Sequence, residues 1–153
     1  MASNGTATRI MGFYGYSDSG KTTLIEKAIS YLKQAGYAVA AIKQTNKSIH
    51  VDQEGKDTGR FRAAGAEAIA LCTPAATSLI FNSELEIRKL AAIMIGHHKP
   101  DFILVEGARE DWIPKIRIGK IGERANTVWS YNGSFDDLIN VILEKGEPCT
   151  LFK

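Results

Sequence analysis

Cysteine is scarce in this sequence, and so is net charge. The two cysteines, Cys72 and Cys149, are too few and too far apart for a disulfide scaffold or a zinc module. A formal net charge of +2 is too small to indicate nucleic-acid binding. No apolar run approaches the roughly 20 residues of a membrane-spanning helix, and the first residues form no charged-then-apolar leader. We therefore expect a soluble cytoplasmic protein with reduced thiols that binds neither nucleic acid nor membrane.

The overall amino-acid composition is that of an ordinary globular protein. Hydrophobic residues make up 44% and charged residues 24%, which argues against disorder and repeat architectures. The length of 153 residues suits one domain with a substantial core. We expect a single domain over residues 1–153, in which residues 1–8 and 146–153 are loose ends.

The most informative stretch is Gly15 to Thr22, which reads GYSDSGKT. It matches the phosphate-binding loop (Walker A) pattern G-x-x-x-x-G-K-[ST] without a mismatch. Glycine lets successive backbone N–H groups turn toward one phosphate. Lys21 adds a cation aimed at the outer phosphates, and the Thr22 hydroxyl suits Mg²⁺. The structural alternative is a flexible glycine loop between two core elements.

The residues around this loop supply the context that the pattern requires. Arg9 to Tyr14 is an apolar run of strand length, and Thr23 to Ala35 has apolar residues at helical spacing, with Gly36 placed to end the helix. Tyr37 to Lys43 predicts a second buried strand. A strand–loop–helix–strand unit of this kind places phosphate at the carboxyl edge of a parallel sheet. We therefore predict an α/β protein with a mostly parallel sheet flanked by helices, the P-loop NTPase fold.

A second chemical stretch runs from Asp101 to Gly107. Four apolar residues predict a fully buried strand, and Glu106 emerges at its carboxyl end. In phosphate-loop proteins an acid at this position faces the loop from a neighbouring strand and holds Mg²⁺ directly or through water. The alternative is a strand-terminal carboxylate in solvent.

The rest of the chain predicts further elements. These are short helix Arg60 to Gly65, strands Ala68 to Cys72 and Ser78 to Phe81, helix Glu84 to Ile95 ended by Gly96, half-exposed strand Lys115 to Ile118, strand Thr127 to Ser130, and helix Phe135 to Lys145 with Ser134 as its N-cap. The polar loop Gln44 to Gly59 is long enough to be functional. The basic stretch Lys115 to Arg124 is either a solvated sheet edge or a surface for an anionic partner.

The nucleotide base is not fixed by a motif. Asn46-Lys47 comes too early for the N-K-x-D element of many GTPases and lacks its acid, and we interpret the D-x-x-G match Asp52 to Gly55 as coincidental. A small-molecule kinase that uses the same loop is one alternative to a GTPase. A pure adapter, in which nucleotide is structural, is another.

The chain resembles the MobB family of molybdopterin-guanine dinucleotide biosynthesis adapter proteins. The matching segments are Gly15 to Glu26, Ala41 to Lys43, Gly55 to Thr58, Arg60 to Ala66, Val105 to Gly107 and Pro114 to Ile116. Gly55 to Ala66 is the specific part, because countless NTPases share the phosphate-binding loop. The resemblance implies a homodimer that binds GTP, hydrolyses it weakly, and acts beside the nucleotidyltransferase that joins GMP to molybdopterin, itself a candidate ligand.

Carried onto this chain, the resemblance implies a set of site residues. It implies phosphate binding by Gly15, Ser17, Asp18, Ser19, Gly20, Lys21, Thr22 and Thr23. It implies Mg²⁺ at Thr22, with Glu106 and Asp57 as the nearby acids. Lys21, Glu106 and Asp57 are then the candidate catalytic residues. We expect GTP and Mg²⁺ as ligands, a molybdopterin guanylyltransferase as partner, and slow turnover because no general base or arginine finger stands out.

Overall fold

A computed structural model describes residues 7–47 and 57–149 of the chain. The chain divides into two compact units, the larger formed by Met1–Thr45 and Ala91–Lys153 and the smaller by Asn46–Leu90. The single domain over residues 1–153 stays a prediction. No helix in the described ranges is long and apolar enough to cross a membrane.

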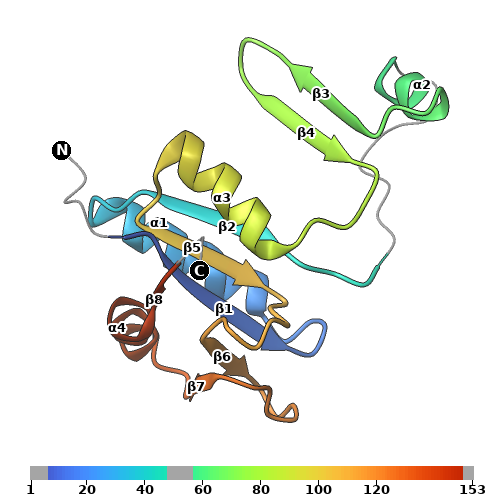
Figure 1. The fold of residues 1–153 in the computed structure, drawn as a ribbon. Coiled ribbons are helices and arrows are strands. Elements are labelled where there is room, and N and C mark those ends of the chain that lie inside the picture. The colour runs from blue at the N-terminus through green and yellow to red at the C-terminus, as the bar shows by residue number, and fades with distance from the viewer. Residues whose placement is uncertain (1–6, 48–56, 150–153) are drawn as a thin grey trace. The chain divides into compact units, whose positions relative to one another are not determined.

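The larger unit is built on one mostly parallel sheet (Figure 1). Its strands are β1 (Arg9–Gly15), β2 (Val39–Lys43), β5 (Phe102–Glu106), β6 (Lys115–Ile118), β7 (Thr127–Ser130) and β8 (Glu147–Pro148). The order is β2-β5-β1-β6-β7 with every pair parallel, and β8 runs antiparallel to the start of β1. The predicted α/β class and mostly parallel sheet are confirmed.

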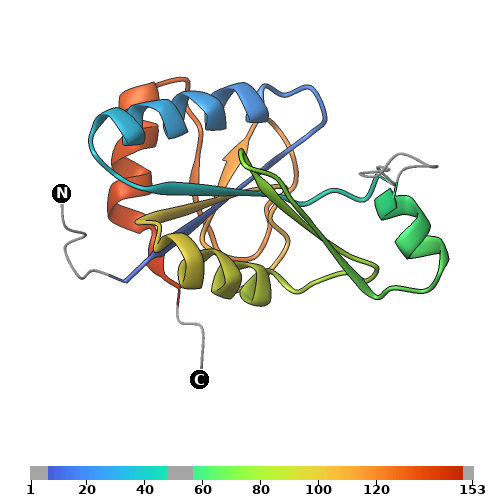
Figure 2. The same ribbon diagram turned by 90° about the horizontal axis from the view of Figure 1, so that it is seen from above.

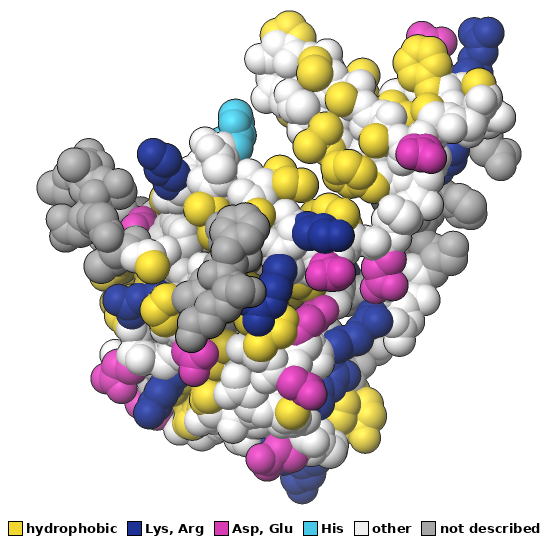
Figure 3. Space-filling view, viewed as in Figure 1, with side chains coloured by type: hydrophobic (Ala, Val, Ile, Leu, Met, Phe, Trp, Pro, Cys, Tyr) yellow, Lys and Arg dark blue, Asp and Glu magenta, His cyan; other side chains and the backbone are white. Residues whose placement is uncertain are grey.

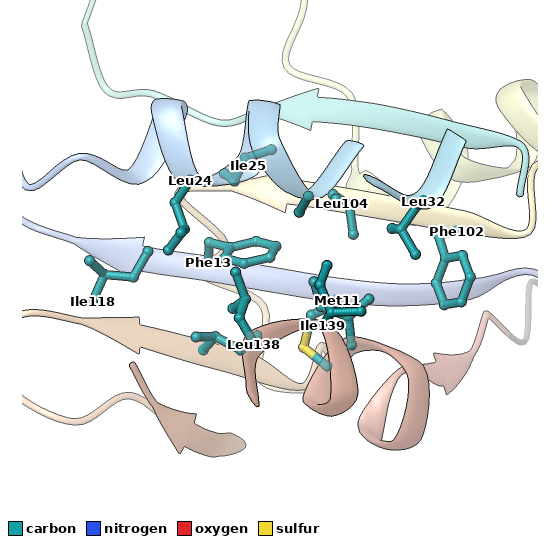
Figure 4. Close-up of a cluster of buried hydrophobic side chains, with 13 residues drawn as sticks. Met11, Phe13, Leu24, Ile25, Leu32, Phe102, Leu104, Ile118, Leu138 and Ile139 are labelled. Atoms are coloured by element: carbon teal, nitrogen blue, oxygen red, sulfur yellow. The ribbon is translucent and has the colours of Figure 1, made fainter. Parts of the chain in front are cut away.

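Helices cover both faces of this sheet. They are α1 (Lys21–Gln34), α3 (Ile87–His98) and α4 (Phe135–Lys145). Figure 2 shows α1 along one face and residues 91–98 of α3 along the other. Apolar side chains of α1 and α4 pack against Met11 and Phe13 of β1 in the main core (Figure 4). The N-cap prediction for α4 is confirmed, since the Ser134 hydroxyl accepts a hydrogen bond from the Asp137 N–H at 3.2 Å.

Four sequence-based expectations in the larger unit are corrected by the structure. The second strand is not buried, because β2 lies at the end of the strand order and only Ile42 of its five residues is buried. Strand β6 is not half-exposed, because it lies between β1 and β7 and three of its four side chains are buried. Helix α3 does not end at Gly96 but continues to His98. The segment from residue 146 is not wholly loose, because β8 pairs with Arg9 and Ile10.

The smaller unit contains a helix and a two-stranded antiparallel sheet. They are α2 (Asp57–Ala63), β3 (Ala68–Cys72) and β4 (Thr77–Phe81). All three were predicted from the sequence, although α2 begins three residues earlier than expected. Most of the predicted polar loop, the D-x-x-G match and the first part of the Gly55 to Ala66 motif lie outside the described residues.

Candidate functional site

The phosphate-binding loop joins the end of β1 to the start of α1. Gly15 ends β1 beside Ile118 of β6, and a Cβ atom on Gly15 would lie 2.5 Å from the Ile118 carbonyl oxygen. Gly20 precedes the helix with φ of 82° and provides no side-chain cap. The first N–H groups of α1 therefore have no side-chain acceptor at the cap position, which is the arrangement that binds anions at helix N-termini.

Lys21, the first residue of α1, folds back over this loop. Its ammonium donates hydrogen bonds to the Tyr16 carbonyl oxygen and, at 3.4 Å, to the Ser19 hydroxyl. Asp18 adopts a left-handed backbone with φ of 61°, which helps the chain turn within the loop. The loop is thus compact, and its one lysine side chain is directed across it.

Glu106 reaches the loop from the neighbouring strand. In the parallel register of β1 and β5, Glu106 lies opposite Phe13, two residues before the end of β1. The Thr22 hydroxyl lies 3.1 Å from each Glu106 carboxylate oxygen and donates to them. The structure therefore brings together two of the three predicted Mg²⁺ ligands, which are 84 residues apart in the sequence.

The chemistry of Thr22 and Glu106 fits Mg²⁺. This ion prefers oxygen ligands and usually takes one or two from the protein, with the others from substrate phosphates and water. A hydroxyl and a carboxylate that meet beside a phosphate-binding loop provide such a set. The Glu106 side chain is 15% exposed, so it is held by its surroundings but open to a ligand.

Lys43 is a further charged group beside Glu106, and the sequence-based prediction missed it. It ends β2, lies opposite Glu106 in the parallel register, and places its ammonium 3.4 Å from Glu106 Oε1. The signal that could have identified it is its position at the carboxyl end of a predicted strand, the same edge as Glu106.

The backbone around Glu106 is tightly held. Gly107 has φ of 81°, and its N–H donates to the Phe13 carbonyl oxygen at 2.8 Å. A Cβ atom on Gly107 would collide with the carbonyl oxygen of Gln44. The Gln44 N–H in turn donates to the Glu106 carbonyl oxygen at 2.8 Å. These contacts fix the direction in which the Glu106 side chain leaves the sheet.

The first basic residue of the predicted basic stretch lies inside the fold. Lys115 is fully buried, and its ammonium donates to the carbonyl oxygens of Ile113 at 3.0 Å and Ala125 at 2.6 Å. Burial lowers the pKa of Lys115, and the negative charges of Asp111 and Glu110 oppose this shift in part.

Arg124, at the end of the same stretch, is also engaged internally. Its guanidinium lies 4.9 Å from the Tyr14 ring centroid and donates to the Ala108 carbonyl oxygen at 2.8 Å. The interpretation of this stretch as a solvated edge or an anion-binding surface therefore fails at both of its ends.

Asp57, the third predicted acid, lies in the smaller unit. It is the first residue of α2, and its 88% exposed side chain lies 3.8 Å from the Arg60 guanidinium. The assignment of Asp57 to the Mg²⁺ site stays a prediction.

The sequence matches one known protein family and several of its members. A family model described as molybdopterin guanine dinucleotide synthesis protein B, or MobB, matches residues 10–144. The chain belongs to the MobB family. A relative from Escherichia coli, named molybdopterin-guanine dinucleotide biosynthesis adapter protein, is 34% identical over 76% of this chain and 69% of its own. A relative of the same name from Haemophilus influenzae is 36% identical over 70% of this chain and 61% of its own.

Lengths differ within the family. A Methanocaldococcus jannaschii relative is 34% identical over 94% of this chain but only 64% of its own. The chain therefore spans less than two thirds of the Methanocaldococcus and Haemophilus MobB relatives.

Solved MobB structures share the fold. The crystal structure of Bacillus subtilis MobB superposes with a TM-score of 0.68 at 20% identity, over 91% of this chain and 98% of that one. A MobB homologue from Bacillus stearothermophilus gives a TM-score of 0.62 at 20% identity, over 89% and 96% of the two chains. At this level of identity the likeness establishes the fold alone.

Proposed function

We propose that this chain binds GTP with Mg²⁺, hydrolyses it slowly, and acts as an adapter in molybdopterin-guanine dinucleotide biosynthesis. The observation that carries the nucleotide part is the contact between Thr22 and Glu106 beside the phosphate-binding loop. The adapter part rests on membership of the MobB family and on the names of its relatives.

Each group at the loop has a physical role in this proposal. Backbone N–H groups of residues 17–22 and the Lys21 ammonium hold the β- and γ-phosphates, because they direct positive partial and full charges at them. Thr22 and Glu106 would hold Mg²⁺, which neutralises phosphate charge and fixes phosphate orientation. Glu106 is supported in this role by the backbone contacts of Gly107 and Gln44.

Slow hydrolysis follows from the groups near the loop. Among the described residues, the side chains bonded at the loop are Lys21, Ser19, Thr22 and Glu106, and none of them is an arginine. An arginine supplied to a phosphoryl-transfer site raises its rate by about 10³–10⁵-fold. We propose Arg60 or Arg62, from this or a second subunit, as such a group.

A homodimer is part of the proposal and would involve the smaller unit. Its exposed large apolar side chains are Phe61, Leu71, Leu79 and Phe81, with exposed fractions of 58%, 48%, 54% and 38%. Figure 3 shows hydrophobic side chains gathered on the surface of this unit. An isolated two-stranded sheet is marginally stable in water, so a second copy that covers β3 and β4 would stabilise both copies.

The partner of the dimer would be the guanylyltransferase that joins GMP to molybdopterin, with molybdopterin as a further candidate ligand. This assignment extends the adapter names of the relatives to this chain. A cytoplasmic location stays a prediction.

Analysis of nucleotide retained by the purified protein, followed by titration, tests the function. Mass spectrometry should detect retained guanine nucleotide, and calorimetry should give tighter binding of GTP than of ATP, dependent on Mg²⁺. GDP release stimulated by a small-molecule substrate would instead favour the kinase alternative. Absence of hydrolysis, with partner capture that is insensitive to nucleotide, would favour a pure adapter.

A further inference from the structure

We propose that Lys43 competes with Mg²⁺ for Glu106 and so sets the Mg²⁺ concentration at which the nucleotide site fills. This inference rests on the proposed function. It assigns Lys43 a positioning role, because the residue acts on the site through Glu106. The sequence pattern of the phosphate-binding loop does not include this lysine.

The competition follows from one shared atom. Oε1 of Glu106 accepts the Thr22 hydroxyl at 3.1 Å and lies 3.4 Å from the Lys43 ammonium. Mg²⁺ binds carboxylate oxygens at about 2.1 Å. An ammonium and a divalent cation at the same carboxylate oxygen would repel each other at close range. This repulsion makes the two cations compete, so that each one lowers the affinity of the carboxylate for the other.

Lys43 is the partner that can move. Its side chain is 58% exposed, whereas that of Glu106 is 15% exposed. A lysine ammonium on a flexible four-carbon stem is readily hydrated when it leaves an ion pair. The Glu106 backbone is held through Gly107 and Gln44, so the carboxylate stays in place.

The strength of the Lys43–Glu106 ion pair predicts a modest effect on the apparent Mg²⁺ affinity. Ion pairs this exposed contribute little, equivalent to about two- to fivefold in an equilibrium constant. Lys43 therefore neutralises Glu106 in the nucleotide-free protein without blocking Mg²⁺. The result is a site that fills at a higher Mg²⁺ concentration than Thr22 and Glu106 alone would require.

Three variants test this role. Lys43→Met removes the charge but keeps an unbranched side chain, and Lys43→Arg keeps the charge. Lys33→Met is the matched control, since Lys33 lies in the last turn of α1, about 18 Å along the helix from Lys21.

Two measurements compare these variants. Calorimetric titration with the non-hydrolysable analogue guanosine 5′-(β,γ-imido)triphosphate is repeated over a series of Mg²⁺ concentrations. Binding of Mn²⁺ to nucleotide-free protein, followed by electron paramagnetic resonance, is a second readout.

Lys43→Met should lower the half-saturating Mg²⁺ concentration about two- to fivefold and increase Mn²⁺ binding. Lys43→Arg and Lys33→Met should both keep the values of the unsubstituted protein. An unchanged or raised Mg²⁺ requirement in Lys43→Met overturns the proposal, as does weaker analogue binding at saturating Mg²⁺, which would make Lys43 a phosphate ligand. Failure of the unsubstituted protein to bind the analogue at any Mg²⁺ concentration refutes the proposed function itself, and Mn²⁺ binding then decides the role of Lys43 alone.

Discussion

The Thr22 hydroxyl and the Glu106 carboxylate are in direct contact, at 3.1 Å from each carboxylate oxygen. Thr22 lies in the first turn of α1, and Glu106 ends β5. Because β1 and β5 are parallel neighbours, the loop after β1 and the last residue of β5 lie at the same sheet edge. This contact makes Glu106 the acid to test first.

Glu106→Gln should weaken Mg²⁺-dependent GTP binding. The amide keeps the shape of the side chain but removes the charge that attracts the ion, so we expect a loss of about tenfold or more in apparent Mg²⁺ affinity. Calorimetry with Mg²⁺ and with chelator measures it. Glu26→Gln, at an exposed position of α1, is the control. If Glu106→Gln retains the Mg²⁺ dependence of the unsubstituted protein, Glu106 is a structural residue.

Gly107→Ala should destabilise the larger unit more than Gly119→Ala does. Both glycines have positive φ, 81° and 78°, so both substitutions carry backbone strain of about 1–3 kcal/mol. At Gly107 the added Cβ also meets the Gln44 carbonyl oxygen, whereas at Gly119 it meets no atom within 4 Å. Urea denaturation measures the difference. Equal losses in the free energy of unfolding would contradict the close approach at Gly107.

Lys115 should make the free energy of unfolding rise with pH in the alkaline range. Burial lowers its pKa in the folded chain below the ordinary 10.5, so between the two values the unfolded chain binds more protons. The free energy of unfolding contributed by this group therefore rises with pH up to about 10.5. Denaturation from pH 7.5 to 10.5 should show this slope reduced in Lys115→Met and retained in exposed Lys120→Met. Identical slopes in the two variants would contradict it.

Leu79→Lys should weaken the proposed dimer. Leu79 is 54% exposed on β4, and burial of a leucine side chain contributes about 1.5–3 kcal/mol. A symmetric interface loses this contribution twice, so the dimer dissociation constant should rise at least about tenfold. Analytical ultracentrifugation measures it. Ser30→Lys, at an exposed position of α1 in the larger unit, is the control. A monomeric unsubstituted protein, or an unchanged constant in Leu79→Lys, would rule out this surface.

The predictions from sequence succeeded where the determining residues are contiguous. The position of the Gly15 to Thr22 segment between a strand and a helix is such a case, because the residues that determine it adjoin the segment. The approach of Glu106 was also predictable, since an acid at the end of a buried parallel strand must emerge at the ligand edge of the sheet. Local sequence patterns therefore predicted Thr22 and Glu106, the two residues that meet at the candidate Mg²⁺ site.

The predictions from sequence failed where the pairing of strands that are distant in the sequence decides which side chains are buried or in contact. Alternation in β6 suggested one solvent face, but its place between β1 and β7 buries Lys115. Lys43 meets Glu106 only through the register of β2 with β5, which sequence spacing does not reveal. Gly96 stays helical because a glycine within a helix costs only about 1 kcal/mol, which packing elsewhere along a helix can offset.

The central claim is that residues 15–22 bind a nucleoside triphosphate, and calorimetric GTP titration of Lys21→Ala in the presence of Mg²⁺ tests it most directly. Lys21 supplies the ammonium over the loop, where it donates hydrogen bonds to the Tyr16 carbonyl oxygen and the Ser19 hydroxyl. We predict saturable GTP binding by the unsubstituted protein and its loss in Lys21→Ala, with circular dichroism and unfolding midpoint unchanged. Unchanged GTP affinity in a folded Lys21→Ala protein would contradict the account.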